Sequence, residues 1–295
     1  HSFPTRRSSD LAVRLMAQIK RQLHVKLPLS ALFEAPRISQ LAQRILATPS
    51  KDPGYALIPL QPEGTKPPFF CIHPAGGNVL CYRDMAQWFS PQRPLLCFES
   101  PQLLAAQAAP RSLSELAAFY IKELQAHTPQ GPYHLGGWSF GGIVAYEMAC
   151  QLTARGIPVA SVTLFDSALL VPGDHDPRQV AAQRLLRMAA FLEMSFGLRV
   201  PLSHAELIAL PPQDQLDLFS RCLRQTGNEQ DTTLADQILR FAAVFQDNLT
   251  LLRTYRPKPY PGVVLLFRAA EKVDDKLADL EFPGDTPLLG WESVA

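Results

Sequence analysis

The sequence lacks the long apolar run that a membrane-spanning helix requires, because no eighteen consecutive residues are apolar. It also lacks an excess of charge, with 28 lysine and arginine residues against 27 aspartate and glutamate residues. This balance argues against a nucleic-acid-binding face and against a surface drawn to anionic membranes. We therefore expect neither nucleic acid nor a membrane among the partners of the chain.

Cysteine is scarce and unpatterned. The five cysteines are scattered without a Cys-x-x-Cys spacing, and several lie inside apolar runs. An odd number without metal-ligand spacing favours buried free thiols over disulfides or zinc, and we expect no metal site. Free thiols persist in reducing compartments, so this usage predicts a cytoplasmic protein.

The start of the sequence has neither an initiator methionine nor the apolar region of a signal peptide. Residues 1–10 resemble the translation of a sequencing adaptor, and they are excluded from fold reasoning. We interpret the chain as a fragment of a longer protein.

Residues 11–47 carry the periodicity of short amphipathic helices. Apolar residues recur every four positions along the first of them, which predicts one buried stripe. The stripe consists of Leu11, Leu15, Ile19 and Leu23, with Met16 beside it. Further helical stretches are predicted at 29–33 and 38–45, and the proline, glycine and polar residues at 48–55 predict a linker.

From residue 56 short apolar runs alternate with longer helical stretches, which predicts an α/β fold with a mostly parallel sheet covered on both faces. Strands are predicted at 56–60, 68–72, 95–99, 133–136, 160–165 and 263–268. Helices are predicted from an N-cap at Ser112, with Glu115 completing a capping box, and from 141 to about 153. Residues 170–255 show helical periodicity without a clear strand, and a helical insertion of this length is a candidate lid.

The string Gly-Trp-Ser-Phe-Gly at 137–141 lies between an apolar strand and an apolar helix. This is the pattern of a nucleophile elbow, in which a sharp turn presents the serine hydroxyl and the following helix directs free N–H groups at developing negative charge. Ser139 is therefore the candidate catalytic nucleophile. The alternative is a glycine-rich strand-to-helix turn with a bystander serine.

A second candidate element is the apolar strand that ends in His-Pro-Ala-Gly-Gly at 73–77. Together with the elbow it is typical of α/β-hydrolases, which place half of the oxyanion hole in such a small-residue loop. We assign the backbone N–H groups of Ala75 and Phe140 to that hole. A phosphate cradle is the competing interpretation, but the loop lacks the lysine and spacing of a P-loop. His73 precedes the serine in the chain and is expected to brace the loop rather than to act as the base.

Two positions at strand ends can supply the acid of a catalytic triad. Asp166 ends the strand after the elbow helix, whereas Glu271, Asp274 and Asp275 follow the later strand. Most α/β-hydrolases use the later position. Asp166 also has a simpler explanation as a turn-forming aspartate.

From about residue 56 onward the chain is similar to the thioesterase domains that terminate nonribosomal peptide synthetases and polyketide synthases. The matching strings are Phe-Cys-Ile-His-Pro-Ala-Gly-Gly at 70–77, Gly-Gly-Trp-Ser-Phe-Gly-Gly at 136–142, Leu-Phe-Asp-Ser at 164–167, Tyr-Arg-Pro at 255–257, Leu-Phe-Arg-Ala at 266–269 and Gly-Trp at 290–291. The resemblance implies an α/β-hydrolase with a helical lid, and it places the acid at Asp166.

Residues 11–47 resemble the second half of an acyl or peptidyl carrier domain, on the runs Leu-Ala-Val-Arg-Leu at 11–15 and Leu-Ser-Ala-Leu-Phe-Glu-Ala-Pro at 29–36. In that family a helix begins just after a serine that carries phosphopantetheine. Ser9 falls in the matching register but lies in the adaptor-like stretch, so we do not assign attachment to it. The resemblance implies a carrier domain in cis as the partner and no cofactor bound by the thioesterase domain itself.

The histidine that the resemblance requires is also lacking. The family's base lies in a Gly-Asp/Asn-His string after one more strand, beyond the Gly-Trp element, and this chain has no histidine after His204. His175 matches the string superficially, but it follows Asp166 closely, at the entrance to the predicted lid. We therefore expect the chain, at 56–295, to be truncated before its catalytic histidine and to turn over substrate very slowly.

The resemblance predicts a serine thioesterase that releases an acyl or peptidyl chain from a phosphopantetheine carrier. Release would be hydrolysis or macrocyclisation through an acyl-serine. Two alternatives remain open: a freestanding editing thioesterase or ester hydrolase, and a non-catalytic acyl-binding module that has lost its base. The carrier-like helices at 11–47 argue against a freestanding enzyme.

Overall fold

The computed structural model describes residues 31–47, 56–89, 91–104, 109–170, 176–196, 199–226, 232–270 and 286–294, with scattered positions between 11 and 27. The chain divides into two compact units. The sheet unit comprises the described residues of 30–170, 243–271 and 283–295, and the helical unit those of 1–29 and 171–242. The predicted adaptor at 1–10 and linker at 48–55 lie outside the described residues.

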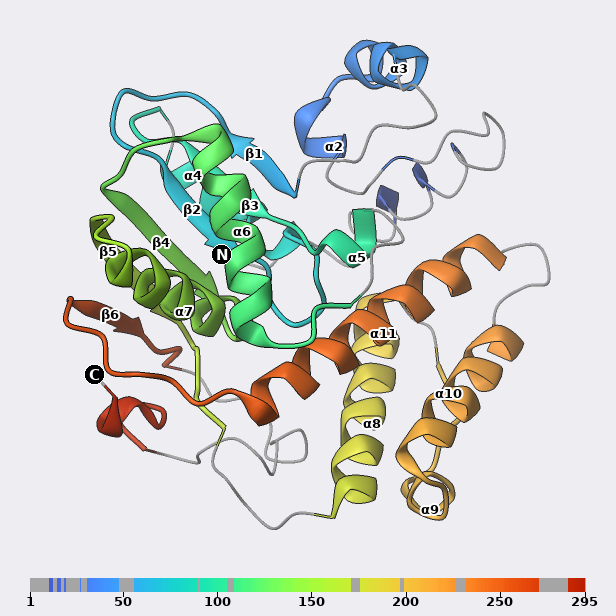
Figure 1. Cartoon of the computed structure of the whole chain (residues 1–295). Coiled ribbons are helices and arrows are strands. Elements are labelled where there is room, and N and C mark those ends of the chain that lie inside the picture. The colour runs from blue at the N-terminus through green and yellow to red at the C-terminus, as the bar shows by residue number, and fades with distance from the viewer. Residues whose placement is uncertain are drawn as a thin grey trace. The chain divides into compact units, whose positions relative to one another are not determined.

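A six-stranded sheet lies at the centre of the sheet unit, with the strand order β1-β3-β2-β4-β5-β6 (Figure 1). The strands are β1 (Leu57–Gln61), β2 (Phe69–Ile72), β3 (Leu95–Phe98), β4 (Tyr133–Trp138), β5 (Val159–Phe165) and β6 (Val264–Phe267). Among these described strands β1 runs antiparallel to β3, and all other pairings are parallel. Every predicted strand is present, and the mostly parallel α/β sheet is confirmed. β4 extends beyond the predicted 133–136 to Trp138.

The segments between the parallel strands contain helices, as parallel pairing requires. In the sheet unit, α2 (Ala31–Glu34) and α3 (Ile38–Ala47) precede β1. The 3₁₀ turn η1 (Leu80–Tyr82), α4 (Arg83–Phe89), α5 (Pro101–Leu104), α6 (Leu113–His127) and α7 (Phe140–Ala154) lie between strands, and the 3₁₀ turn η3 (Trp291–Ser293) follows β6. The helical unit holds α8 (Pro177–Phe196), α9 (His204–Ile208) and α10 (Pro212–Thr226). The long helix α11 (Thr232–Thr254) contributes residues to both units.

The central strands are buried on both faces, which explains why they read as continuous apolar runs. Along β2, Phe70 and Ile72 join the core on the side of α6 and α7. Phe69 and Cys71 point the other way and join a second core, against which Met85 of α4 packs. The alternation therefore gives each face of the sheet its own layer of helices.

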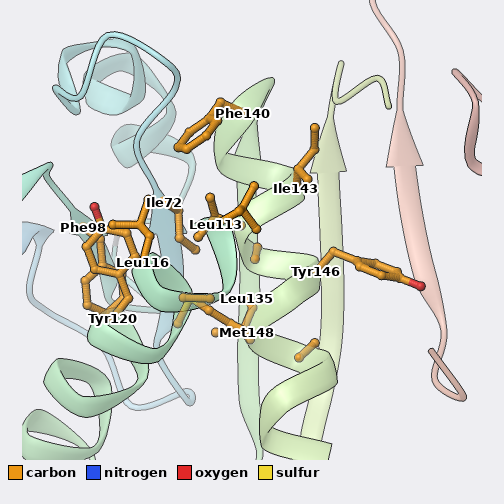
Figure 2. Close-up of a cluster of buried hydrophobic side chains, with 14 of the residues drawn as sticks. Ile72, Phe98, Leu113, Leu116, Tyr120, Leu135, Phe140, Ile143, Tyr146 and Met148 are labelled. Atoms are coloured by element: carbon orange, nitrogen blue, oxygen red, sulfur yellow. The ribbon is translucent and has the colours of Figure 1, made fainter. Parts of the chain in front are cut away.

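The larger core lies between the sheet and the helices α6 and α7 (Figure 2). The Tyr120 ring on α6 lies 4.9 Å from the Phe98 ring on β3, measured between centroids. Leu135 on β4 is fully buried, and α7 is buried along most of its length, from Phe140 to Leu152. This packing fixes α7, and with it the turn that leads into the helix.

All five cysteines are free thiols. Cys71 and Cys97 are buried at paired positions of β2 and β3, whereas Cys150 and Cys222 are half-buried and Cys81 is exposed. Burial raises the pKa of the Cys97 thiol, which keeps it protonated and lets it pack as a small apolar side chain.

The N-terminus of α6 confirms half of the predicted capping box. The Ser112 hydroxyl accepts the N–H of Glu115 at 3.1 Å. The predicted second half is wrong, because the Glu115 carboxylate accepts the N–H of Arg111 at 2.8 Å instead. Ser112 enters the helix with extended backbone, φ −150° and ψ 159°, and Arg111 is the donor within reach.

The helices at 31–34 and 38–47 confirm two of the three stretches predicted for the carrier-like segment. The stripe predicted for the first stretch is confirmed in part. Ile19 and the neighbouring Met16 are buried, whereas Leu11 and Leu15 are 62% and 40% exposed, so these two leucines are wrong as members of the stripe. Leu23 lies outside the described residues.

In the helical unit, α9 and α10 pack against α8, and Leu185, Leu207 and Phe219 are buried. The buried Gln215 amide donates to the carbonyls of Arg178 and Leu210, both at 3.1 Å. The described residues of 176–242 contain no strand, as the periodicity predicted. A role as a lid stays a prediction. None of the described helices combines the length and the apolar content needed to cross a membrane.

β6 lies at one edge of the described sheet, and its side chains alternate in burial. Val264 and Leu266 pack on the large core, whereas Leu265 and Phe267 are 47% and 56% exposed. Exposed apolar side chains on a strand at the sheet edge favour self-association.

Two neighbouring leucines test the register of β6. We predict that Leu265→Lys changes the free energy of unfolding by less than about 0.5 kcal/mol and lowers self-association, because this side chain is exposed. Leu266→Lys should lower it by about 2 kcal/mol or more, because it places an ammonium group against the core. Urea unfolding and size-exclusion chromatography measure both effects. Equal losses in the two variants would contradict the register.

Candidate active site

Ser139 occupies the turn between β4 and α7 with a backbone conformation that is rare outside glycine. Its φ is 55° and its ψ is −121°, and its N–H donates to the carbonyl of Phe165 at 2.9 Å. A non-glycine residue in this region costs about 1–3 kcal/mol and persists only where the surroundings determine it. The strained strand-to-helix turn predicted for Ser139 is therefore present, and the serine is half-buried at its corner.

Close backbone contacts explain both glycines that flank the serine. A Cβ on Gly137 would lie 2.4 Å from the carbonyl carbon of Gly141. A Cβ on Gly141 would lie 2.1 Å from the carbonyl oxygen of Ile72, at the end of β2. No rotamer relieves a clash with backbone atoms, so α7 approaches the strands this closely only with glycine at both positions.

Tyr82 braces the same corner from η1. The N–H of Trp138 donates to the Tyr82 hydroxyl at 2.7 Å, and that hydroxyl donates to the carbonyl of Ile72 at 2.6 Å. Burial raises the pKa of Tyr82, so the hydroxyl stays neutral and keeps its donor. The bridge joins the ends of β2 and β4. The Trp138 side chain itself is 43% exposed beside Ser139.

The loop after β2 is a tight turn held by its own backbone. The carbonyl of Pro74 accepts the N–H of Gly77 at 2.9 Å, and the carbonyl of Gly77 accepts the N–H of Ser100 at 2.8 Å. Ala75, in the middle of this turn, is buried. Its loop follows β2, and Phe140 follows β4, so the two predicted oxyanion residues lie beyond the ends of adjacent parallel strands. The N–H of Phe140 belongs to the first turn of α7, where an α-helix supplies no acceptor.

His73 is held on both ring nitrogens. Nδ1 lies 2.7 Å from the carbonyl oxygen of Pro74, so this nitrogen carries the proton and donates. Nε2, 2.6 Å from the Tyr120 hydroxyl, is then the acceptor. The ring also stacks on Phe140, with centroids 5.7 Å apart and planes 22° apart. Burial lowers the pKa of His73 to about 4, which agrees with a bracing role and not with that of a base.

Asp166 directly follows β5, beside the serine turn. Trp138 pairs with Phe165, so Ser139 and Asp166 are the next residues on two paired strands. Asp166 has φ 44°, and its Oδ1 accepts the N–H of Ala269 at 2.6 Å. The later acids Glu271, Asp274 and Asp275 lie outside the described residues.

Apart from His73, no described histidine lies at the strand ends that lead to Ser139 and Asp166. His127 is the last residue of α6, His134 lies near the amino end of β4, and His204 begins α9 in the helical unit. His175 lies outside the described residues. Among the described residues no cluster of histidine, cysteine, aspartate and glutamate is suited to hold a metal ion.

Comparison with known families adds to this geometry. Residues 67–193, which include the loop, the serine turn and Asp166, match the family described as Thioesterase domain. This part of the chain is a thioesterase domain. Residues 8–45 match the family described as Phosphopantetheine attachment site, so a carrier-domain segment precedes the thioesterase domain, as the resemblance implied.

Relatives of the thioesterase domain are nonribosomal peptide synthetases. The chain is 32% identical over 264 residues to a dimodular nonribosomal peptide synthase of Bacillus subtilis (strain 168), covering 88% of the chain and 11% of that protein. It is 35% identical over 272 residues to malpibaldin synthetase of Mortierella alpina, covering 90% of the chain and 4% of that protein. The chain therefore spans a small part of the length of these relatives.

Solved structures agree with the fold. A four-domain nonribosomal peptide synthetase bound to AMP and glycine is similar with a TM-score of 0.67 and 27% identity, covering 97% of this chain and 21% of that one. The NocB thioesterase domain, in covalent complex with a fluorophosphonate nocardicin G analogue, has a TM-score of 0.50 and 26% identity, covering 71% of this chain and 74% of that one. The predicted α/β-hydrolase class is confirmed.

The buried His73 makes the stability of the thioesterase domain depend on pH. An unperturbed histidine titrates near 6.5, whereas burial lowers the pKa of His73 to about 4 in the folded protein. Between these values the unfolded state binds more protons, so the free energy of unfolding falls as the pH drops from 6.5 toward 4. We predict that His73 accounts for a loss of up to about 3 kcal/mol. Urea unfolding across this range measures the loss, and an NMR titration that finds His73 protonated at pH 6 would refute the assignment.

Proposed function

We propose that this thioesterase domain releases an acyl or peptidyl chain from the phosphopantetheine arm of a carrier domain, in nonribosomal peptide or polyketide biosynthesis. The observation that carries the proposal is Ser139, at a strained turn beside Asp166, in a chain that also matches the carrier family. The arm is part of the substrate in this scheme, and the thioesterase domain holds no cofactor of its own. The attachment serine lies outside residues 11–47.

Ser139 is the proposed nucleophile. Its Oγ bonds to the thioester carbonyl carbon while its proton passes to a base, and the C–S bond then breaks as the proton moves to the departing thiolate. The N–H groups of Ala75 and Phe140 would donate to the oxyanion of the tetrahedral intermediate. Attack of water on the acyl-serine ester would release the chain as a free acid. Attack of a hydroxyl or amine within the chain itself would release it as a macrocycle.

Asp166 is the proposed orienting acid. Its position one residue beyond the Phe165–Trp138 pair supports this role, as does its half-buried carboxylate. None of the four described histidines is proposed as the base. Both ring nitrogens of His73 are engaged, His134 lies near the amino end of β4, and His127 and His204 belong to the helices α6 and α9. The family resemblance expects the base after the Gly-Trp pair at 290–291, where this sequence has no histidine, and we therefore predict slow chemistry in the 295-residue chain.

The helices between residues 176 and 242 are proposed as the lid that decides between hydrolysis and cyclisation, by excluding water and folding the acyl chain. The carrier match at 8–45 favours release in cis over a freestanding editing thioesterase or ester hydrolase. A non-catalytic acyl-binding module is the remaining alternative, and reactivity of Ser139 separates it from an enzyme.

We predict that an acyl fluorophosphonate labels the 295-residue chain slowly and at Ser139 alone. Imidazole should speed labelling by about tenfold or more, because it supplies the proton acceptor that the described residues do not. Intact-mass and peptide mass spectrometry measure the rate and the site, and Ser139→Ala should abolish the adduct. Absence of any adduct in imidazole would refute the assignment of Ser139 as the nucleophile. Fast labelling without imidazole would refute only the claim that the chain lacks a base.

Asp166→Asn should lower activity only where a catalytic base is present. In a chain that carries the family's Gly-Asp/Asn-His string, we predict a loss of about 10³–10⁴ in kcat for a thioester substrate, because the histidine loses its orienting partner. In the 295-residue chain, the labelling rate without imidazole should change by less than about twofold. The acid acts through the base, so its loss has little further effect where the base is missing. Asparagine keeps an Oδ1 acceptor for Ala269, so folding is preserved. An unchanged kcat would return the role to the later acids.

A further inference from the structure

Asn248 is a buried polar side chain that the proposed chemistry does not yet use. It lies on α11 and is 1% exposed. Its side-chain amide donates to the carbonyl oxygen of Ala75 at 2.8 Å, across 173 residues of sequence. Both residues belong to the sheet unit. A buried amide aimed at one backbone carbonyl of a loop fixes the orientation of that peptide group.

The preceding peptide group of the loop is held in the same way. The carbonyl of Pro74 accepts two hydrogen bonds, from Nδ1 of His73 at 2.7 Å and from the N–H of Gly77 at 2.9 Å. Two side chains, that of the adjacent His73 and that of the distant Asn248, therefore hold consecutive carbonyls, at Pro74 and Ala75. The loop also has little room to shift, because a Cβ on Gly77 would lie 2.8 Å from Val244 of the same helix α11.

The geometry of a trans peptide turns these carbonyl contacts into a constraint on the N–H groups. Within one peptide group the C=O and N–H bonds point in opposite directions. Holding the Pro74 carbonyl toward His73 directs the Ala75 N–H away from it. Holding the Ala75 carbonyl toward Asn248 directs the Gly76 N–H away from α11. A hydrogen bond accepted by a carbonyl also polarises its peptide group, which makes the paired N–H a stronger donor.

We propose that Asn248 is a positioning residue of the oxyanion hole, which acts with His73 to hold the two peptide groups on either side of Ala75. The inference rests on the proposed function, since the Ala75 N–H is the proposed donor. Asn248 holds the next peptide group, so it acts on that N–H by restricting the backbone torsions of Ala75. Asn248 touches no reacting atom. Its contribution appears in the transition state, when charge develops on the substrate oxygen and a misaligned N–H stabilises it less.

The test compares Asn248→Leu with a matched control, Gln61→Leu. Gln61 is 7% exposed, and its side-chain amide likewise donates to backbone carbonyls, at Glu63 and Arg93. It lies on β1, and no residue of the proposed catalytic machinery contacts it. Both variants lose buried amide-to-carbonyl bonds, so both should lose stability, but only Asn248→Leu should change the chemistry.

Fluorophosphonate labelling of the 295-residue chain in imidazole gives the chemical readout. We expect Asn248→Leu to lower the maximal labelling rate by about tenfold or more, with the half-saturating probe concentration within about twofold, because the lost interaction acts in the transition state. Gln61→Leu should leave both values unchanged. The proposal is overturned if the maximal labelling rate of Asn248→Leu is unchanged, or if only the half-saturating probe concentration changes.

An NMR readout keeps the inference separate from the proposed function. The amide resonances of Ala75 and Gly76 should shift in Asn248→Leu and stay in place in Gln61→Leu. If the parent chain is not labelled at Ser139, the proposed function fails, and the resonances alone decide whether Asn248 orients the loop. Resonances that do not move in Asn248→Leu overturn the positioning role whatever the labelling result.

Discussion

The parallel register of β2, β4 and β5 is the constraint on which the rest of the sheet unit depends. Ile72 pairs with Gly137, and Trp138 pairs with Phe165. The chain therefore leaves three neighbouring strands at the same end of the sheet. The loop proposed to form the oxyanion hole, Ser139 and Asp166 each follow one of these strands. A slip of one residue in any strand would turn its side chains to the wrong face and separate these groups.

Packing of the core stabilises two strained backbone conformations at the end of the sheet. Ser139 and Asp166 both have positive φ, at a cost of about 1–3 kcal/mol each. The burial of α7 offsets that cost, because the helix is packed against both the sheet and α6 and cannot withdraw from the turn. Tyr82 adds a local brace by bridging the ends of β2 and β4. The burial of apolar surface therefore stabilises the strained turn that fixes the position of the Ser139 hydroxyl group.

Local patterns predicted most of the fold and the positions of the candidate residues. Strands buried on both faces are continuous apolar runs, and the serine turn follows from glycines that backbone contacts require. Residues whose partners are distant in sequence were not predictable: neither Tyr82 nor Asn248 belongs to a recognisable string, and each matters through one bond to a remote carbonyl. The error at Glu115 is of the same kind, because the donor it binds depends on how the chain enters the helix.

The continuity of α11 limits how such enzymes can be recombined. Its first turns, up to Ala242, belong to the helical unit, whereas Asn248, Leu249 and Leu252 are part of the sheet unit and its core. A chimera that borrows the helical segment of a related thioesterase therefore needs its splice junction inside this helix, ahead of Asn248. Grafting the whole helix would replace the contact from Asn248 to the Ala75 carbonyl with a foreign one, along with the helical segment.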